Sequence, residues 1–233
     1  MPLISADQAP PANPASTVIL LRPANNGFEV LLLLRAKAIK FAGGAWVFPG
    51  GRIDPEDGEN AGTDNLDSYA AASIAAARES EEEAGLTLDP ESFVEYSHWT
   101  TPLAEKKRFS TWFLLGDVDS SCTVTVDDGE IVEYQWLTPQ QAIDEHRSKT
   151  LKILPPTYLT LLELAQFEDI AEVRNFAAER SAPRFFPNMV FHDKTVSVLY
   201  QDDPGYKDGN AHAEGDQHRM TMIDDCWHYI QPR

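Results

Sequence analysis

Four acidic residues occupy the five positions 79–83, directly after Arg78. In an α-helix, which turns once in about 3.6 residues, Glu79, Glu82 and Glu83 fall on one face. Crowded carboxylates repel one another and destabilise a helix unless a positive charge lies between them. Oxygen-rich clusters suit hard divalent cations such as Mg2+, Mn2+ or Ca2+. The run therefore predicts a metal site, although many glutamate runs are only solvated acidic faces.

The sequence around this run predicts the elements that would position it. The Ala-rich stretch 69–84 is strong helix material, an aspartate or serine just before it can cap its start, and Gly85 suits its end. Upstream, the short apolar strand 45–48 ends at the turn Pro49-Gly50-Gly51. A glycine turn followed by an acidic helix is therefore the predicted frame of the site.

The remaining pattern predicts a chain of mixed α and β elements. Apolar runs typical of strands occupy residues 16–22, 28–35, 92–100, 107–118 and 130–137. Helices are predicted at 140–146, 158–167 and 169–180, and hairpin-like β runs at 189–200 and 219–230, around a polar loop at 202–217 that we expect to be flexible. We therefore predict a flexible leader at 1–15, a domain over 16–150 with an irregular loop at 52–67, and a helical and hairpin extension over 151–233 packed on it.

The charge and cysteine content of the chain exclude several kinds of partner and site. The chain has 233 residues, of which 37 are acidic and 19 basic, giving a formal net charge of −18. Such a surface repels nucleic acid and anionic membranes, so we expect neither as a partner. With two isolated cysteines, Cys122 and Cys226, neither a disulfide framework nor a cysteine zinc site is expected. The first 16 residues lack the pattern of a signal peptide, which predicts a cytoplasmic protein.

The glycine turn and the acidic helix together resemble the Nudix hydrolases, whose signature is G-x5-E-x7-R-E-U-x-E-E-x-G-U with U apolar. The chain matches that signature at Gly51, Arg78, Glu79, Glu82, Glu83, Gly85 and Leu86. The resemblance covers residues 16–165. It implies an α/β fold of the α+β kind, a Nudix-type α/β/α sandwich with a mixed sheet, and hydrolysis of a diphosphate linked to a nucleoside.

The chain departs from the signature in two places. Ser80 stands where an apolar residue is usual. Gly51 and Arg78 lie 27 positions apart where the signature places 14, so the connecting loop is 13 residues longer. The position of the first signature glutamate is consequently Ala70, and that carboxylate is either missing or supplied from the loop by Glu56, Asp57 or Glu59.

The resemblance also implies roles for individual residues. Glu79, Glu82 and Glu83, with the Gly50 carbonyl, would be ligands of Mg2+ or Mn2+. Arg78 would hold the glutamates through charge-assisted hydrogen bonds, unless it is merely an exposed helix arginine. A loop carboxylate from the far side of the site often acts as ligand or base in this family. Glu130 is the first candidate and Glu133 the next, with exposed strand-edge acids as the alternative interpretation.

Residues 31–51 also partly follow a coenzyme A signature found within the family. Together with the long insertion, this resembles the branch that includes the peroxisomal acyl-CoA diphosphatase and its bacterial relatives. Arg35 and Lys40 would then contact the 3′-phosphate of coenzyme A, unless these cations only solubilise a loop. Arg108 is a candidate phosphate contact or a partner in a cross-strand salt bridge.

Three functions remain open at this point. The first is a metal-dependent hydrolase of coenzyme A or acyl-CoA, which releases a phosphopantetheine product and adenosine 3′,5′-bisphosphate. The second is hydrolysis of ADP-ribose, NADH or a dinucleoside polyphosphate at the same centre. The third is a catalytically silent ligand-binding or regulatory module of the same fold. In each case the partner is a small nucleoside diphosphate derivative, and the resemblance also allows a homodimer.

Overall fold

The computed structural model describes residues 9–127 and 129–231. In chain order, the first elements are β1 (Ala12–Pro23), β2 (Phe28–Arg35), β3 (Trp46–Val47), β4 (Gly50–Arg52), α1 (Pro55–Asn60), α2 (Tyr69–Ala84), the 3₁₀ helix η2 (Pro90–Ser92), β5 (Val94–Thr100), β6 (Arg108–Asp117) and β7 (Ile131–Leu137). The later elements are α3 (Pro139–Arg147), α4 (Pro155–Leu164), α5 (Ile170–Glu179), β8 (Arg184–Phe185), β9 (Asn188–His192), β10 (Thr195–Leu199), β11 (Arg219–Ile223) and β12 (Cys226–Ile230).

The larger sheet is built around β1. This strand pairs in parallel with β6 and antiparallel with both β2 and β4. The sheet continues from β6 through β5 to β8, while β2 also pairs with β3 and β7. The eight strands thus form a mixed sheet, as the sequence predicted. Because β4 lies against β1, the glycine turn is fixed to the centre of the sheet.

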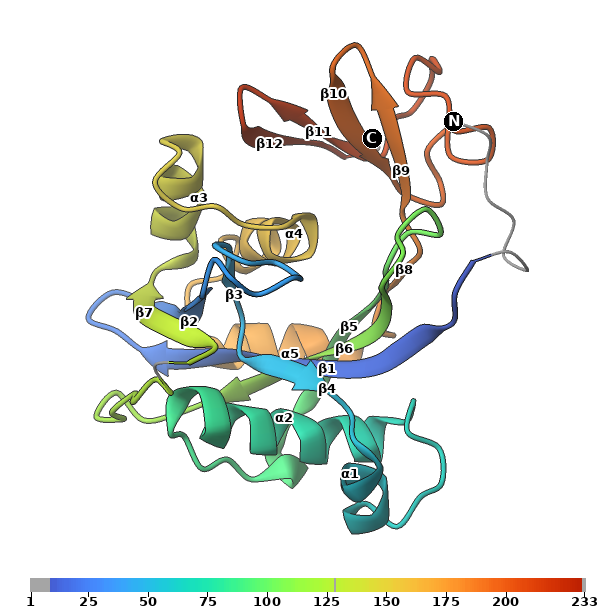
Figure 1. Cartoon of the computed structure of the whole chain (residues 1–233). Coiled ribbons are helices and arrows are strands. Elements are labelled where there is room, and N and C mark those ends of the chain that lie inside the picture. The colour runs from blue at the N-terminus through green and yellow to red at the C-terminus, as the bar shows by residue number, and fades with distance from the viewer. Residues whose placement is uncertain (1–8, 128, 232–233) are drawn as a thin grey trace.

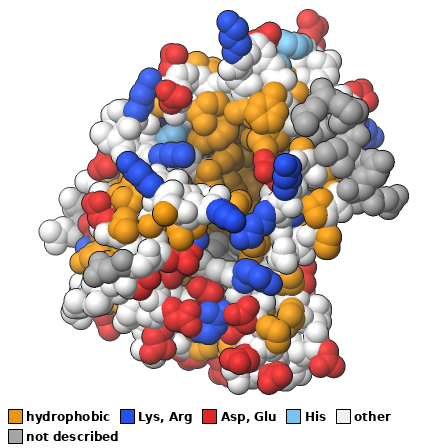
Figure 2. Space-filling view, viewed as in Figure 1, with side chains coloured by type: hydrophobic (Ala, Val, Ile, Leu, Met, Phe, Trp, Pro, Cys, Tyr) orange, Lys and Arg blue, Asp and Glu red, His pale blue; other side chains and the backbone are white. Residues whose placement is uncertain are grey.

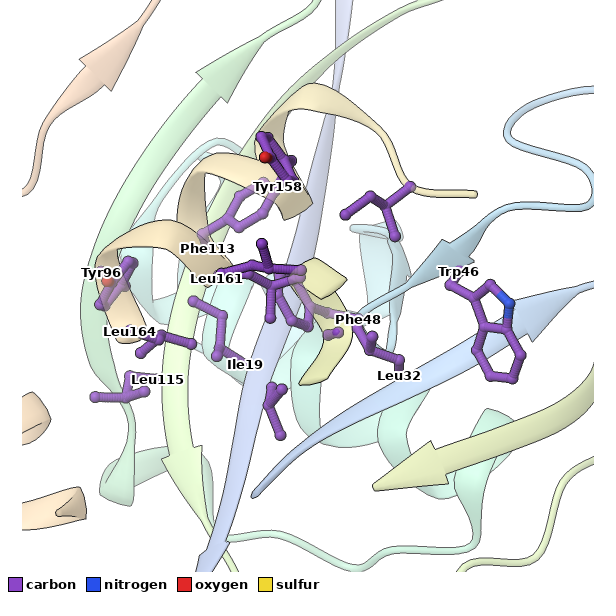
Figure 3. Packing of buried hydrophobic residues seen from close by; sticks show 14 of the residues in the cluster. Ile19, Leu32, Trp46, Phe48, Tyr96, Phe113, Leu115, Tyr158, Leu161 and Leu164 are labelled. Atoms are coloured by element: carbon purple, nitrogen blue, oxygen red, sulfur yellow. The ribbon is translucent and has the colours of Figure 1, made fainter. Parts of the chain in front are cut away.

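Helices cover both faces of this sheet (Figure 1). On one face α2 packs closely through small side chains, including Ala72 and Ala76, which are fully buried. On the other face, α3, α4 and α5 bury larger side chains, and Figure 3 shows Leu161 and Leu164 of α4 in the same packed cluster as Ile19 of β1. The predicted α/β/α sandwich is confirmed. Within the described ranges, every helix is too short or too polar to span a bilayer.

A small antiparallel sheet of β9 to β12 lies beyond α3 and α4 (Figure 1). It is joined by hydrogen bonds to α3 and to the segment before α4: the Trp227 backbone N–H donates to the His146 ring at 2.9 Å, and the Trp227 indole donates to the Ile153 carbonyl at 3.0 Å. Each predicted C-terminal β run is itself a hairpin, turning at Asp193-Lys194 and at Asp224-Asp225, where φ is positive.

Two parts of the N-terminal half differ from the sequence prediction. Residues 12–15, predicted as leader, belong to β1 because they pair with β6 from Arg108 onward; residues 1–8 lie outside the described part. The irregular loop predicted at 52–67 contains helix α1, which begins at an Asp54 cap followed by Pro55. Asp57 of this helix is 2% exposed, so the insertion carries a buried carboxylate.

Candidate active site

Helix α2 carries most of the predicted catalytic residues, and its ends are well defined. The Ser68 hydroxyl accepts a hydrogen bond from the Ala71 N–H, and Gly85 ends the helix with a φ of 66°. The glutamates at 81–83 stand in the last turn, where the helix dipole favours cations rather than carboxylates. This placement weakens the helix, so the acids do not contribute to helix stability through the dipole.

Arg78 holds three carboxylates at once. Its Nε and one terminal nitrogen donate to the two oxygens of Asp57, both at 3.0 Å. The other terminal nitrogen donates to Glu79 at 2.9 Å and to Glu82 at 3.1 Å. The hydrogen bonds that Arg78 donates to Asp57 are the main cause of a raised pKa of Arg78, so the guanidinium stays charged. Arg78 therefore fixes two of the predicted ligands relative to the insertion helix.

The glycine turn approaches the same carboxylates from the sheet side. The Gly50 N–H donates to Glu83 at 2.9 Å. Gly50 has a φ of 153°, and a Cβ there would meet the Ser16 carbonyl oxygen at 2.3 Å, so only glycine fits. A Cβ on Gly51 would lie 2.4 Å from a carboxylate oxygen of Glu79. The two glycines thus make room for the glutamates and supply a backbone donor.

Arg35, near the end of β2, joins α2 to the loop that precedes β7. One of its terminal nitrogens donates to Glu130, and the other lies 3.8 Å from Glu83. The loop is fixed by Asp127, whose carboxylate accepts the backbone N–H groups of Glu130 and Ile131, both at 2.8 Å. Glu130 therefore faces the α2 glutamates, from the opposite side of the site.

Burial and mutual repulsion perturb the carboxylates of the cluster. Burial raises the pKa of Glu83 to about 8 against the opposing Gly50 hydrogen bond, with smaller contributions from the charges of Glu79 and Glu130. Burial also raises the pKa of Glu79, with the charges of Glu82 and Glu130 adding to the rise and Arg78 opposing it. Oxygen ligands that repel one another at a partly buried site fit a hard divalent cation, because a cation would remove the repulsion.

The remaining predicted residues lie at different distances from this cluster. Lys40 is exposed in the loop between β2 and β3, which begins next to Arg35. Arg108 donates to the backbone carbonyls of Thr101 at 3.1 Å and Pro10 at 2.8 Å, so its donors serve the chain itself. The Ser80 hydroxyl, fully buried, donates to the Ala76 carbonyl at 2.7 Å, which satisfies it beneath the helix.

Two further features of the site were not singled out by sequence reasoning. Asp57 was only one of three loop candidates, and Arg35 was assigned to a phosphate rather than to the glutamates. The Asp-Pro pair at 54–55 is the signal that could have placed Asp57, because a capping residue followed by proline typically starts a helix. For Arg35 no local signal exists, since Glu130 is 95 positions away.

A cavity of about 960 Å3 lies between the larger sheet, α4 and the small sheet of β9 to β12, the C-terminal sheet. Its aromatic lining includes Trp99 and Phe185, whose rings stack with centroids 4.1 Å apart, and Trp227. Arg147 and Lys149 also line it. Figure 2 shows an apolar hollow on the face that also presents the acidic cluster, with lysine and arginine side chains between the two.

The family model described as "NUDIX domain" matches residues 12–156, more than half of the chain. The acyl-coenzyme A diphosphatase NUDT19 of Xenopus laevis is 28% identical over 123 residues, which are 47% of this chain and 32% of that protein. The putative nudix hydrolase 7 of Caenorhabditis elegans is 26% identical over 176 residues, or 60% and 57% of the two chains. The chain therefore spans less than two thirds of the length of either relative.

Solved structures support the same fold. The crystal structure of a NUDIX hydrolase from Alicyclobacillus acidocaldarius aligns with a TM-score of 0.64 over 74% of this chain and 97% of that one. At 22% sequence identity, this likeness concerns the fold alone. About a quarter of this chain lies outside the alignment, so the chain has elements in addition to those of that structure.

Proposed function

Because the chain belongs to the Nudix family, we propose that it is a metal-dependent hydrolase that cleaves the diphosphate of coenzyme A or an acyl-CoA. The observation that carries this proposal is the convergence of Glu79, Glu82 and Glu83 with Glu130, held by two arginines and a glycine turn. One water adds across the P–O–P linkage, which yields a phosphopantetheine product and adenosine 3′,5′-bisphosphate.

The cluster would divide the work among its residues. Glu79, Glu82, Glu83 and the Gly50 carbonyl would hold Mg2+ or Mn2+, which neutralises diphosphate charge and makes a water nucleophilic. Arg78 orients the carboxylates of Glu79 and Glu82 through its hydrogen bonds. Such fixed geometry lowers the reorganisation that the reaction requires.

Glu130 is our candidate for the base that takes the proton of the attacking water. Its side chain is 45% exposed, so solvent reaches it, and the guanidinium of Arg35 is its hydrogen-bond donor. We accordingly propose Arg35 as a positioning residue for Glu130 and Glu83 rather than as a contact to the 3′-phosphate. That contact would fall to Lys40, which is exposed on the adjoining loop.

The substrate class is supported by two observations. The acyl-coenzyme A diphosphatases are among the similar proteins, although the matches cover a minor part of their length. The aromatic cavity lies on the same face as the acidic cluster (Figure 2), and its size is in the range that holds a drug-sized apolar group. We place the acyl arm of the substrate in this cavity, with the diphosphate at the glutamates.

Hydrolysis of a panel of diphosphates, with products identified by mass, tests the proposal. With Mg2+ or Mn2+, wild type should cleave acyl-CoA, and Glu82→Gln should lose at least about a hundredfold in kcat/KM. Glu81→Gln is the matched control, because Glu81 is exposed in the same helical turn. Release of no product from any panel member would leave a binding module, and preference for ADP-ribose or a dinucleoside polyphosphate would leave the second enzyme class.

Two comparisons test the placement of the substrate. Lys40→Ala should raise KM severalfold for coenzyme A but not for 3′-dephospho-CoA, whereas Lys106→Ala on another exposed loop should change neither. Leu162→Trp in the cavity wall should raise KM for long-chain acyl-CoA while free coenzyme A is unaffected. Equal effects on both members of either pair would refute that part of the placement.

A further inference from the structure

Two histidines and an aspartate come together at the outer end of the C-terminal sheet. His192 ends β9, Asp193 begins the turn to β10, and His212 comes from the long loop between β10 and β11. Figure 1 shows this turn and parts of this loop at the end of the molecule opposite α2. One ligand atom from each residue lies within 4.8 Å of the other two.

The Asp193 carboxylate lies close to both imidazoles, at distances that suit ligands of one metal ion as well as long hydrogen bonds or ion pairs. The Asp193 Oδ2 lies 3.4 Å from the His192 Nδ1 and 3.3 Å from the His212 Nε2. Hydrogen bonds between nitrogen and oxygen are usually about 2.7–3.2 Å long. Two ligands that are each about 2.0 Å from a tetrahedral zinc ion are roughly 3.3 Å apart. Asp193 therefore stands at ligand spacing from both imidazoles.

The His192 ring is held by a second set of contacts. Its other nitrogen, Nε2, lies 2.8 Å from the Ser197 hydroxyl, which in turn lies 2.7 Å from the Thr221 hydroxyl. A metal-binding histidine commonly has its second nitrogen hydrogen-bonded in this way, which fixes the ring orientation. Asp193 is fixed by the turn itself, where its φ is 46°. Two of the three residues thus belong to one hairpin.

The loop that carries His212 is held by hydrogen bonds from the buried Arg219 side chain. The buried Arg219 guanidinium donates to both oxygens of Asp203, each at 2.7 Å. The same guanidinium donates to the carbonyls of Ala211 and Ala213, on either side of His212. These hydrogen bonds fix the backbone on both sides of His212 and direct a polar loop toward the hairpin. The side chain of His212 is 67% exposed, so its ring can adjust to a ligand position.

We propose that His192, Asp193 and His212 bind a transition-metal ion of the Zn2+ class and thereby tie the loop to the β9–β10 hairpin. Two imidazoles and one carboxylate form a donor set that suits Zn2+, Co2+ or Ni2+ rather than Mg2+. The chain then contains two chemically different metal sites, since the α2 cluster offers only oxygen. Solvent completes the coordination.

Zinc titration against a chromophoric chelator at pH 7.5 tests the site. Excess Mg2+ in the buffer competes with Zn2+ for the oxygen cluster, whereas imidazoles bind Mg2+ poorly. Wild type should bind one Zn2+ whose Kd rises at least about tenfold in His212→Ala and in Asp193→Asn. His228→Ala is the matched control, because His228 is exposed on the same sheet outside the cluster, and it should bind as wild type does.

Hydrogen exchange supplies a readout that does not depend on affinity alone. Zn2+ should slow amide exchange over residues 204–217 in wild type and in His228→Ala, but not in His212→Ala. Circular dichroism confirms that each variant is folded, which the exposure of His212 leads us to expect. Equal zinc affinity in all four proteins, or protection of the loop without zinc, would overturn the proposal and leave an ion-paired cluster.

Discussion

Replacing Asp57 should lower the free energy of unfolding and raise the Mg2+ concentration needed for hydrolysis, because this carboxylate has two structural functions. It binds Arg78 through two hydrogen bonds of 3.0 Å and accepts the Asp54 N–H at 2.8 Å, which caps α1. Asp57→Ala removes both functions. Asp57→Asn keeps an oxygen for the cap but removes the charge, so the pair of variants separates capping from charge pairing.

The magnitude follows from exposure and from the remaining partners. A hydrogen bond to a charged group contributes about 1.5–3 kcal/mol, and removing one partner of a fully buried ion pair costs about 3–5 kcal/mol. Arg78, however, is 29% exposed and keeps Glu79 and Glu82 as partners, which offsets part of the loss. We expect Asp57→Ala to lower the free energy of unfolding by about 2 kcal/mol, or Tm by about 4–8 °C.

Urea unfolding and the Mg2+ dependence of hydrolysis are the assays. Glu56→Ala and Glu59→Ala are the controls, since both residues are exposed on α1, and each should change the free energy of unfolding by less than about 0.5 kcal/mol. The Mg2+ concentration for half-maximal rate should rise at least about tenfold in Asp57→Ala alone. If Asp57→Ala behaves as Glu56→Ala does in both assays, Arg78 does not depend on this carboxylate.

Other substitutions test separate parts of the structure. Gly51→Ala places a Cβ 2.4 Å from Glu79 and should raise the Mg2+ requirement in activity assays without unfolding the chain, since its φ is not in the left-handed region. Ser80→Ala should change the free energy of unfolding in urea by less than about 1 kcal/mol, because the Ser80 hydroxyl bonds only a helix carbonyl. Burial lowers the pKa of His146 from 6.5, so the unfolded state takes up a proton that the folded state excludes. The contribution of neutral His146 to the free energy of unfolding should therefore be complete above pH 6.5. Below pH 6.5 it should fall by at most about 1.4 kcal/mol per pH unit, and this pH dependence should vanish in His146→Gln. Asp203→Asn breaks a pair whose side chains are 4% or less exposed, and urea unfolding should show a loss of about 3–5 kcal/mol.

The parts of the fold with strong local signals could be predicted from the sequence. The helix at 69–84 has the predicted bounds because its alanines, its serine cap and Gly85 all act within one or two turns. Six strands of the larger sheet (β1, β2, β3, β5, β6 and β7) follow from local runs of apolar and β-branched residues. The short strands β4 and β8 were not predicted, because neither Gly50–Arg52 nor Arg184–Phe185 forms such a run. The family resemblance added the layered arrangement, which periodicity alone does not specify.

Elements with weak local signals were missed. The hairpin turns at Asp193-Lys194 and Asp224-Asp225 contain neither glycine nor asparagine, although all four residues have positive φ. The helix predicted at 158–167 begins three residues earlier, because Pro155 stands in its first turn, where a missing N–H is harmless. In each case the chain uses an allowed but less common residue for the conformation.

Contacts between distant residues were not accessible from pattern at all. Arg35 and Glu130 meet because β2 pairs with β7, and the pairing register sets which side chains face the site. Likewise, the cavity under the C-terminal sheet exists because Trp227 docks on α3 and on the chain before α4. Such positions follow from packing of whole elements, which a single sequence does not determine.

The insertion explains why a changed spacing need not abolish the site. Arg78 requires carboxylate oxygens at about 3 Å, wherever in the chain they originate. Lengthening the connection from Gly51 to Arg78 from 14 to 27 positions adds only about 0.6 kcal/mol of loop-closure cost. The Asp57 interaction, which contributes about 2 kcal/mol, more than offsets that cost. A carboxylate on α1 can therefore replace one that the signature places on α2, with Ala70 left free of the role.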